Sequence, residues 1–246
     1  MNYRSFQSFV IVLTLAGLAA AQDIASFEKR TTVKKLDNGL TVLICERPEA
    51  PVFSFSTHVD AGSVQDPHGQ TGLAHMFEHM AFKGTDKIGT TNYAAEKVAL
   101  EKVEQAYAAY IRERDKPVGR DEQKVKELQK AWQDAVAEAN KYVKPNEFPQ
   151  IVEINGGEDL NANTSDDETN YFYSFPENRL ELWAYLESER FLHPVMREFY
   201  KERNVVIEER RMRVDSNPIG RLLEQFTTAA FQAHPYHRPT IGWISD

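Results

Sequence analysis

The segment HMFEH, residues 75–79, decides how the rest of the chain is interpreted. It falls inside a helix that the sequence predicts over about residues 71–82. Because side chains at positions i, i+3 and i+4 share one face of a helix, His75, Glu78 and His79 lie within an arc of about 100°. Each imidazole can therefore offer one ring nitrogen to a single Zn²⁺ ion, while Glu78 stands beside the ion without binding it.

This order of residues is the H-x-x-E-H pattern, the reverse of the commoner helix motif of zinc peptidases. At this content of histidine and glutamate, the pattern arises by chance in about 2 % of chains. The competing interpretation is a polar helix face with two surface histidines. The position of the helix, after predicted strands, favours the metal site.

A catalytic zinc site needs a third protein ligand and leaves its fourth position to water. Cys45 is the only cysteine, so that ligand is a carboxylate or another histidine. The best candidate segment is ERNVVIEE, in which Glu202 and Glu209 stand seven residues apart and so share one helix face, with Glu208 roughly opposite. One helix can thus offer Glu209 to the metal and place Glu202 beside it. A solvated, charged helix is the alternative interpretation.

The remaining pattern predicts strands followed by helices, which indicates an α+β fold. Thr31–Leu36 and Leu40–Cys45 flank an Asp-Asn-Gly turn signal and predict a hairpin, the second strand with the apolar composition of a buried one. Val52–Val59 alternates like a half-exposed strand. One or two further strands are predicted over residues 160–175, and helices at 177–192, 195–214 and 218–231.

Between these regions lies a polar stretch with helical periodicity. Apolar residues recur at helical spacing through residues 93–111 and again through 125–143, and Lys116–Gly119 interrupts the two runs. The pattern predicts a helical hairpin whose apolar seams face each other. Seams of this kind mostly pack, and a binding role is the alternative. Pro145–Pro149 is expected to be a linker.

The N-terminus predicts export. Arg4 precedes an apolar stretch over residues 9–21 that ends in three alanines, which is typical of a signal peptide over residues 1–21. The stretch is shorter than the ~20 residues of a membrane span, although an uncleaved anchor is the alternative. We expect a periplasmic or secreted protein without a stable membrane anchor, with one domain over residues 28–246 that is truncated at its C-terminus.

The net charge of −8 argues against nucleic acid as a partner, because phosphate binding needs a basic surface. A solvated acidic surface that favours solubility is enough to account for it.

Three segments together resemble the peptidase family of pitrilysin, insulin-degrading enzyme and mitochondrial processing peptidase. They are the H-x-x-E-H helix, the E-R-x-x-V-x-x-E helix at residues 202–209, and a glycine pair followed by N-A-x-T at residues 156–164. The resemblance extends from about Val33 to Trp243. It implies the zinc-binding half of an inverzincin metallopeptidase, similar to the beta subunit of mitochondrial processing peptidase, with an antiparallel-rich sheet and helices packed on one face.

The resemblance also assigns roles to individual residues. It implies one Zn²⁺ ion per chain, with Glu209 as the third ligand after the two histidines. Glu78 would take a proton from the attacking water and pass it to the leaving amine, and Glu202 would support that chemistry. Asn161 and Ala162 would lie on an edge strand that pairs with extended peptide substrates.

Family members work as two similar halves, so the resemblance implies that a second homologous half is needed for full activity. A non-enzymatic binding or scaffold subunit of the same fold is the alternative. Glu209 follows His79 by 130 residues, which is more than is usual in the family. We expect that the helical hairpin, residues 94–144, is an insertion that covers the cleft or holds a partner.

Overall fold

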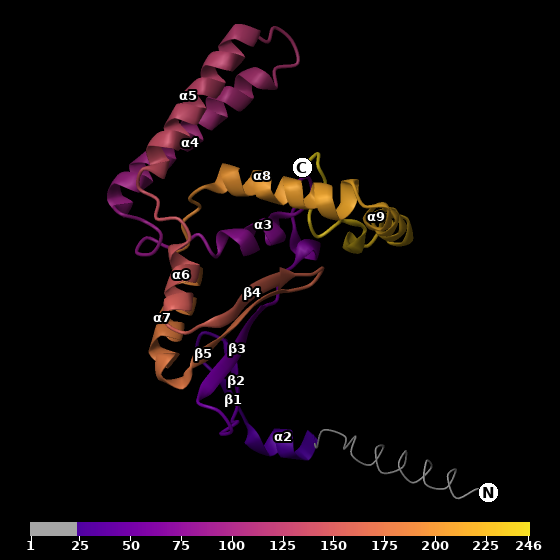
Figure 1. The fold of residues 1–246 in the computed structure, drawn as a ribbon. Helices are drawn as coiled ribbons and strands as arrows, with labels where there is room; N and C mark the ends of the chain where they lie inside the picture. The colour runs from indigo at the N-terminus through magenta and orange to yellow at the C-terminus, as the bar shows by residue number, and fades with distance from the viewer. Residues whose placement is uncertain (1–23) are drawn as a thin grey trace, which may run out of the picture. The chain divides into compact units, whose positions relative to one another are not determined.

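The computed structural model describes residues 24–246, so the predicted signal peptide lies outside the described residues. The chain divides into two compact units, one ending at Pro51 and the other spanning Val52–Asp246. Figure 1 labels the elements of both units. No helix within residues 24–246 combines the length and apolarity that a membrane crossing requires.

The first unit contains a short helix and a hairpin. Helix α2 (Ile24–Arg30) precedes strands β1 (Thr31–Lys35) and β2 (Thr41–Cys45), which pair antiparallel with Val33 opposite Leu43. Both predicted strands are confirmed. The predicted burial of the second strand is wrong, since Leu43 is 68 % exposed. A two-stranded hairpin is a single layer and cannot bury its own faces.

The second unit is built on a three-stranded antiparallel sheet in the order β3-β5-β4, with bounds Val52–Val59, Thr169–Pro176 and Glu158–Thr164. Alternate side chains of β5 are buried, with Tyr171, Tyr173 and Phe175 each 1 % exposed. Side chains along a strand point to opposite faces in turn, so these three residues define the covered face of the sheet. Strand β4 has β5 as its one neighbour in the described sheet.

Helices cover this one face of the sheet (Figure 1). Phe148 and Val152 of α6 (Glu147–Ile154) and Leu186 of α7 (Leu180–Leu192) form a core cluster with Tyr173 and Phe175. Phe82, just after α3 (Leu73–Met80), packs on Tyr171 at a ring separation of 6.0 Å. The architecture is therefore α+β, with an antiparallel sheet and helices on one face.

The predicted helical hairpin is present. Helix α4 (Tyr93–Arg114) is capped by the Asn92 side chain and α5 (Glu122–Asn140) by that of Asp121. Ala99 and Val103 of α4 and Ala139 of α5 are buried in the seam. Helices α8 (Phe199–Arg210) and α9 (Pro218–Ala230) follow, joined by a π-helical turn at Arg211–Asp215.

Three boundaries differ from the prediction. The expected linker at Pro145–Pro149 is partly helix α6, because Pro149 falls in the first helical turn, where its missing N–H costs no hydrogen bond. Helix α8 begins at Phe199 rather than near 195, since Thr85 and Pro194 form a β-bridge there. Helix α3 begins at Leu73 and is capped from outside, as described below.

Candidate metal centre

Helix α3 presents both histidines from one buried face. Its N-terminal amides are bound by a distant carboxylate, because Asp66 accepts hydrogen bonds from the backbone N–H of Gly72 (2.7 Å) and of Ala74 (2.9 Å). A carboxylate at this end also suits the helix dipole. The imidazoles of His75 and His79 lie 4.8 Å apart between ring centres, at 86° to each other. One turn of helix therefore brings two ring nitrogens to the same place.

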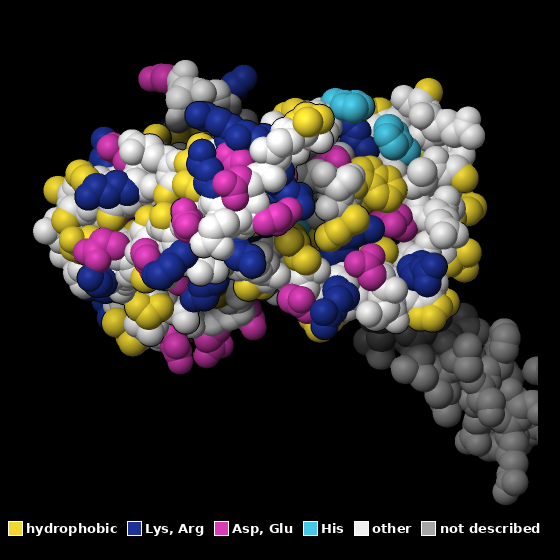
Figure 2. Space-filling model, turned by 90° about the horizontal axis from the view of Figure 1, so that it is seen from above, with side chains coloured by type: hydrophobic (Ala, Val, Ile, Leu, Met, Phe, Trp, Pro, Cys, Tyr) yellow, Lys and Arg dark blue, Asp and Glu magenta, His cyan; other side chains and the backbone are white. Residues whose placement is uncertain are grey.

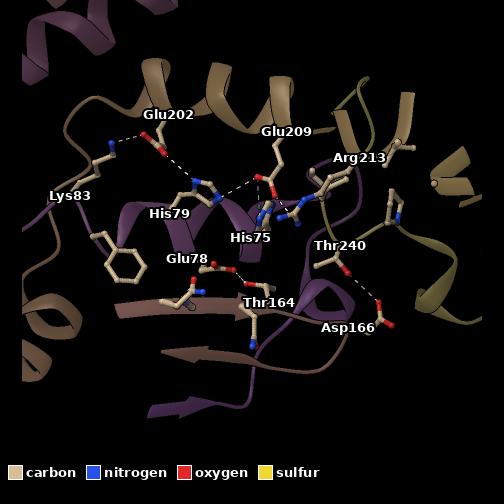
Figure 3. A pocket seen from close by; sticks show the side chains of 18 of the residues that line it. His75, Glu78, His79, Lys83, Thr164, Asp166, Glu202, Glu209, Arg213 and Thr240 are labelled. Atoms are coloured by element: carbon tan, nitrogen blue, oxygen red, sulfur yellow. Dashed lines mark hydrogen bonds and ion pairs between the residues drawn. The ribbon is translucent and has the colours of Figure 1, made fainter. Parts of the chain in front are cut away.

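Helix α8 brings Glu209 to these two nitrogens (Figure 3). Glu209 Oε2 lies 3.5 Å from His79 Nε2 and 3.7 Å from His75 Nε2. Zinc bonds of about 2.0–2.1 Å in a tetrahedron separate ligand atoms by about 3.3–3.4 Å. All three side chains are largely buried and offer ligand atoms within 4.8 Å of one another. The donor set and its spacing fit a zinc ion.

The other oxygen of Glu209 has a separate partner. Arg213, from the π-helical turn, donates from Nη1 to Glu209 Oε1 at 2.8 Å. The guanidinium thus fixes the carboxylate from behind and leaves Oε2 facing the two imidazoles. Arg213 could not be anticipated from the ligand pattern, because its place depends on where the helix widens.

Glu202 lies on the same face of α8 as Glu209. Its Oε1 binds His79 Nδ1, the ring nitrogen other than the one that faces Glu209, at 3.0 Å. The Lys83 ammonium lies 2.5 Å from its other oxygen. The hydrogen bond from His79 lowers the pKa of the Glu202 carboxyl to about 2, with Lys83 adding to the shift. An ionised Glu202 fixes the proton of neutral His79 on Nδ1 and so leaves Nε2 free to bind a metal.

The two histidines are tuned in opposite directions. Burial lowers the pKa of His75, which favours the neutral imidazole that binds metals. The hydrogen bond with Glu202 raises the pKa of His79. Buried Nδ1 of His75 has no hydrogen-bond partner among residues 24–246. His75 therefore relies on packing for its orientation, whereas His79 is oriented by a carboxylate.

Glu78 stays outside the ligand group, as the helix spacing predicts. It is buried, and its Oε2 accepts a hydrogen bond from the Thr164 hydroxyl of β4 at 2.6 Å. Figure 3 shows Glu78 below the histidines, turned toward the end of that strand. A carboxylate held beside the ligand group can accept a proton from a nearby water. Thr164 closed the N-A-x-T pattern without an assigned role, and only the structure supplies one.

A cavity of about 1000 Å³ joins these groups to the edge strand. Asn161 and Ala162 of β4 line it together with the metal-ligand group and Glu78. Ala162 lies opposite Tyr171 of β5, and its amide N–H is bound by the Asn161 side chain at 2.9 Å. The structure thus gathers all seven residues that the sequence singled out around one cavity.

A second group of possible ligands lies elsewhere, where Asp86, Glu189 and His193 also offer atoms within 4.8 Å of one another. Here the Lys87 ammonium lies 2.7 Å from Glu189 Oε1, the oxygen that faces His193 Nδ1 at 3.5 Å. A protein cation therefore already binds the oxygen of Glu189 that faces the histidine, while Oε2 of Glu189 and Oδ1 of Asp86 are buried without a hydrogen-bond partner among residues 24–246.

Comparison with known proteins places the chain in a family. The sequence model of Insulinase (Peptidase family M16) matches residues 41–114 and 122–243, and the gap between the two stretches falls at the turn between α4 and α5. The match spans well over half of the chain, which therefore belongs to the insulinase family. Both α3 and α8, with the ligand group they carry, lie inside the matched stretches.

Individual relatives support the same family assignment. The chain is 29 % identical to the zinc protease PqqE of Helicobacter pylori over 97 % of its own length and 41 % of that protein. It is 42 % identical to the mitochondrial-processing peptidase subunit beta of Lentinula edodes, over 23 % of this chain and 12 % of that one. A crystal structure of a protease from Helicobacter pylori superposes with a TM-score of 0.61 and 28 % identity, covering 87 % of this chain and 38 % of that one. The chain thus spans about two fifths of the first relative and of the solved protease.

Proposed function

We propose that this chain is the zinc-binding half of a metallopeptidase that hydrolyses peptide bonds in extended peptides or unfolded segments. The observation that carries the proposal is the convergence of His75, His79 and Glu209 on one point, with Glu78 held beside them and outside the ligand set. Membership of the insulinase family and similarity to a zinc protease support it.

The three ligands would hold one Zn²⁺ ion per chain, which when bound polarises a carbonyl group and acidifies water. Glu78 would accept the water proton and deliver it to the leaving amine. The Thr164 hydroxyl holds one oxygen of Glu78 and leaves the other for this work. Glu202 would keep the His79 ring in its binding orientation through the bond to Nδ1.

The substrate class follows from the edge of the sheet. Strand β4 borders the cavity and pairs on one side with β5. An extended peptide would add to its other side, and the Ala162 N–H, bound by the Asn161 side chain, is the donor it would take over. Backbone pairing of this kind recognises a chain with little regard to its sequence.

A second homologous half would complete the enzyme. This chain spans 41 % of the zinc protease it resembles, and one half supplies the ligand group but only one wall of a substrate chamber. A non-enzymatic subunit of the same fold is the competing function. It needs no metal and no proton acceptor, yet this chain has both sets of residues in place.

The test is peptide hydrolysis by the chain together with its second half, using Glu78→Gln and, as a matched control, Glu208→Gln. Glu208 is 57 % exposed and lies outside the ligand group, and its change removes the same charge. We expect Glu78→Gln to keep its zinc and lose on the order of 1000-fold in kcat. Full activity of Glu78→Gln, or wild-type protein without stoichiometric zinc, would reject the proposal.

We also propose that the protein is exported to the periplasm or secreted, with cleavage after Ala21. The support is the charged and apolar pattern of residues 1–21 alone. N-terminal sequencing of the mature protein should start at Gln22. A mature protein that retains Met1 would contradict this proposal without affecting the enzymatic one.

A further inference from the structure

We propose that the inner part of the α4–α5 hairpin, residues 93–107 and 132–140 and here called its base, is a positioning element for α8. Within it, Tyr107 and Glu104 set the place of Glu202 and Glu209 by holding Arg203 and Tyr200. The proposal rests on the proposed function, because those two glutamates matter as part of a zinc site. It gives the hairpin a function within the metal centre.

Helix α8 contacts two different elements, α3 on one face and the α4–α5 hairpin on another. Phe199 and Val206 pack on α3 through Met76 and Met80, on the face that also carries Glu202 and Glu209. This face aims the carboxylates at the histidines. Methionine contacts are soft and tolerate sliding, so packing alone does not fix the rotation of α8 about its axis.

The other face of α8 is held by the hairpin through directional contacts. Arg203 Nη1 donates to the Tyr107 hydroxyl at 2.8 Å. Its guanidinium carbon lies 5.7 Å from the Tyr107 ring centre and 5.3 Å from that of Tyr200. The Tyr200 hydroxyl reaches both oxygens of Glu104, at 3.1 and 3.0 Å. These hydrogen bonds and cation–π contacts define an angle as well as a distance.

The hairpin side of this contact is itself rigid. The Tyr107 ring lies 4.3 Å from that of Tyr200 and 5.1 Å from Trp132 of α5. Trp132 also lies edge-on to Tyr200, at 5.3 Å. Both arms of the hairpin thus contribute to one aromatic cluster against α8. Rings of this size lose few rotamers on packing, so the cluster holds its shape.

A buried ion pair secures the start of α8 to the same base. Arg197, 1 % exposed, binds Glu96 in the first turn of α4. Its remaining donors reach the carbonyl oxygens of Lys83, Thr85 and Ile88, in the loop that follows α3. The hairpin, the loop that follows the zinc-binding helix and the segment that leads into α8 therefore meet at one side chain.

The size of the effect follows from helix geometry. A side chain on α8 ends about 5–6 Å from the helix axis, so a rotation of about 20° moves it by about 2 Å. Metal–ligand distances tolerate about 0.2 Å. A small loss of angular restraint at Arg203 is therefore enough to misplace Glu209, six residues further along the helix.

The outer part of the hairpin offers no comparable surface. Its large exposed apolar residues are few, with Val118 at the turn 86 % exposed. Figure 2, which looks down on this side, shows positive and negative side chains interspersed over the face. A surface of this kind is typical of solvated helices rather than of a docking site. The base, and not the tip, is where the hairpin acts.

The test compares Tyr107→Phe with Tyr110→Phe. Each change removes one hydroxyl from α4, and Tyr110 stacks on Trp132 without a bond to α8. Zinc affinity is measured by competition with a chelator, and the ligand geometry by the visible absorption of the Co²⁺-loaded protein. Amide hydrogen exchange of residues 202–209 is measured in the metal-free protein.

We expect Tyr107→Phe to bind zinc three- to tenfold more weakly, to shift the Co²⁺ spectrum and to exchange faster in α8, and Tyr110→Phe to match wild type in all three. Arg203→Met should weaken zinc binding more than Tyr107→Phe does. Arg203→Lys, which keeps the positive charge, should weaken it less than Arg203→Met. Thermal unfolding checks that each variant is folded.

The outcomes separate the two proposals. Equal zinc affinity, spectrum and exchange for Tyr107→Phe and Tyr110→Phe would overturn the positioning role while leaving the zinc site intact. A wild-type chain that binds no zinc would reject the proposed function, and the exchange rates of the metal-free variants would still decide whether the hairpin holds α8.

Discussion

Among residues 24–246, two groups of side chains offer a metal ion the same kinds of atoms at similar separations. One consists of His75, His79 and Glu209, and the other of Asp86, Glu189 and His193. They differ in where the nearest protein cation lies. Arg213 binds the oxygen of Glu209 that faces away from the histidines, whereas Lys87 binds the oxygen of Glu189 that faces His193.

The difference teaches that proximity of ligand-type residues does not define a metal site. In the first group a cation fixes the carboxylate and leaves its inner oxygen free. In the second group the ammonium binds the oxygen that faces the histidine. Burial points the same way, because the side chain of His75 is 9 % exposed while that of His193 is 48 % exposed.

Removing one histidine from each group should give the largest contrast. His79→Ala takes away one of three ligands, so zinc affinity is expected to fall on the order of 1000-fold, or about 4 kcal/mol. His193→Ala should leave both the affinity and the stoichiometry of one ion unchanged. Isothermal titration of the metal-free proteins measures both. A matching loss in His193→Ala would show that the comparison assigns the zinc to the wrong group.

Glu202→Gln should have a smaller effect on the first group. The amide keeps the shape of the side chain but no longer holds the proton of His79 on Nδ1 by charge, and it leaves Lys83 without its closest partner. Loss of such a supporting carboxylate weakens metal binding by about 10- to 100-fold. Glu198→Gln, which changes the other carboxylate near Lys83 at 3.9 Å, is the control. Equal affinities in the two variants would remove the orienting role of Glu202.

The next effect is on the pH dependence of the stability of the metal-free protein, to which Glu202 and His79 at the first group both contribute. The pKa of Glu202 is lowered to about 2 in the folded protein, so its stabilising effect is complete above about pH 4.5 and is lost as the pH falls toward 2. The shift corresponds to about 2 kcal/mol once its coupling to His79 is allowed for. His79 has a raised pKa, so its own contribution is present below pH 6.5 and is lost as the pH rises.

Urea unfolding of the wild type and of Glu202→Gln at pH 5.5 and pH 2.5 measures this difference. The wild type should lose about 2 kcal/mol more than the variant between the two pH values. Parallel losses would mean that the ion pair between His79 and Glu202 does not form in solution.

The sequence could predict the first group because helix geometry relates the residues within each of its two helices. The spacing within residues 75–79 and the separation of seven positions from Glu202 to Glu209 place each set on one helix face before any tertiary contact is known. The resemblance then joined the two helices. Antiparallel strands and the hairpin were likewise visible in local periodicity.

The supporting residues could not be predicted in this way. Thr164, Lys83 and Arg213 each reach the centre across a tertiary contact or from a widened turn, and no local pattern records such a distance. Helix α6 was mistaken for a linker because a proline in a first turn looks the same in sequence as a proline in a loop. The second group was not anticipated at all, since no local pattern or resemblance joins Asp86 to Glu189, 103 positions further along the chain.

The smallest effect is expected from Lys87→Met, and it tests the reason given for the difference between the groups. The change removes the ammonium from Glu189 Oε1 and leaves the carboxylates of Asp86 and Glu189 beside His193. If the lysine is what keeps the second group from binding metal, the variant should take up a second zinc ion with a Kd in the roughly millimolar range.

The double variant Lys87→Met/His193→Ala should then return to one ion, and Lys87→Arg should behave like wild type because it keeps the positive charge. A Lys87→Met protein that still binds a single ion at 5 mM zinc, on the order of five times that expected Kd, would show that the exposure of His193, and not the position of the ammonium, distinguishes the two groups.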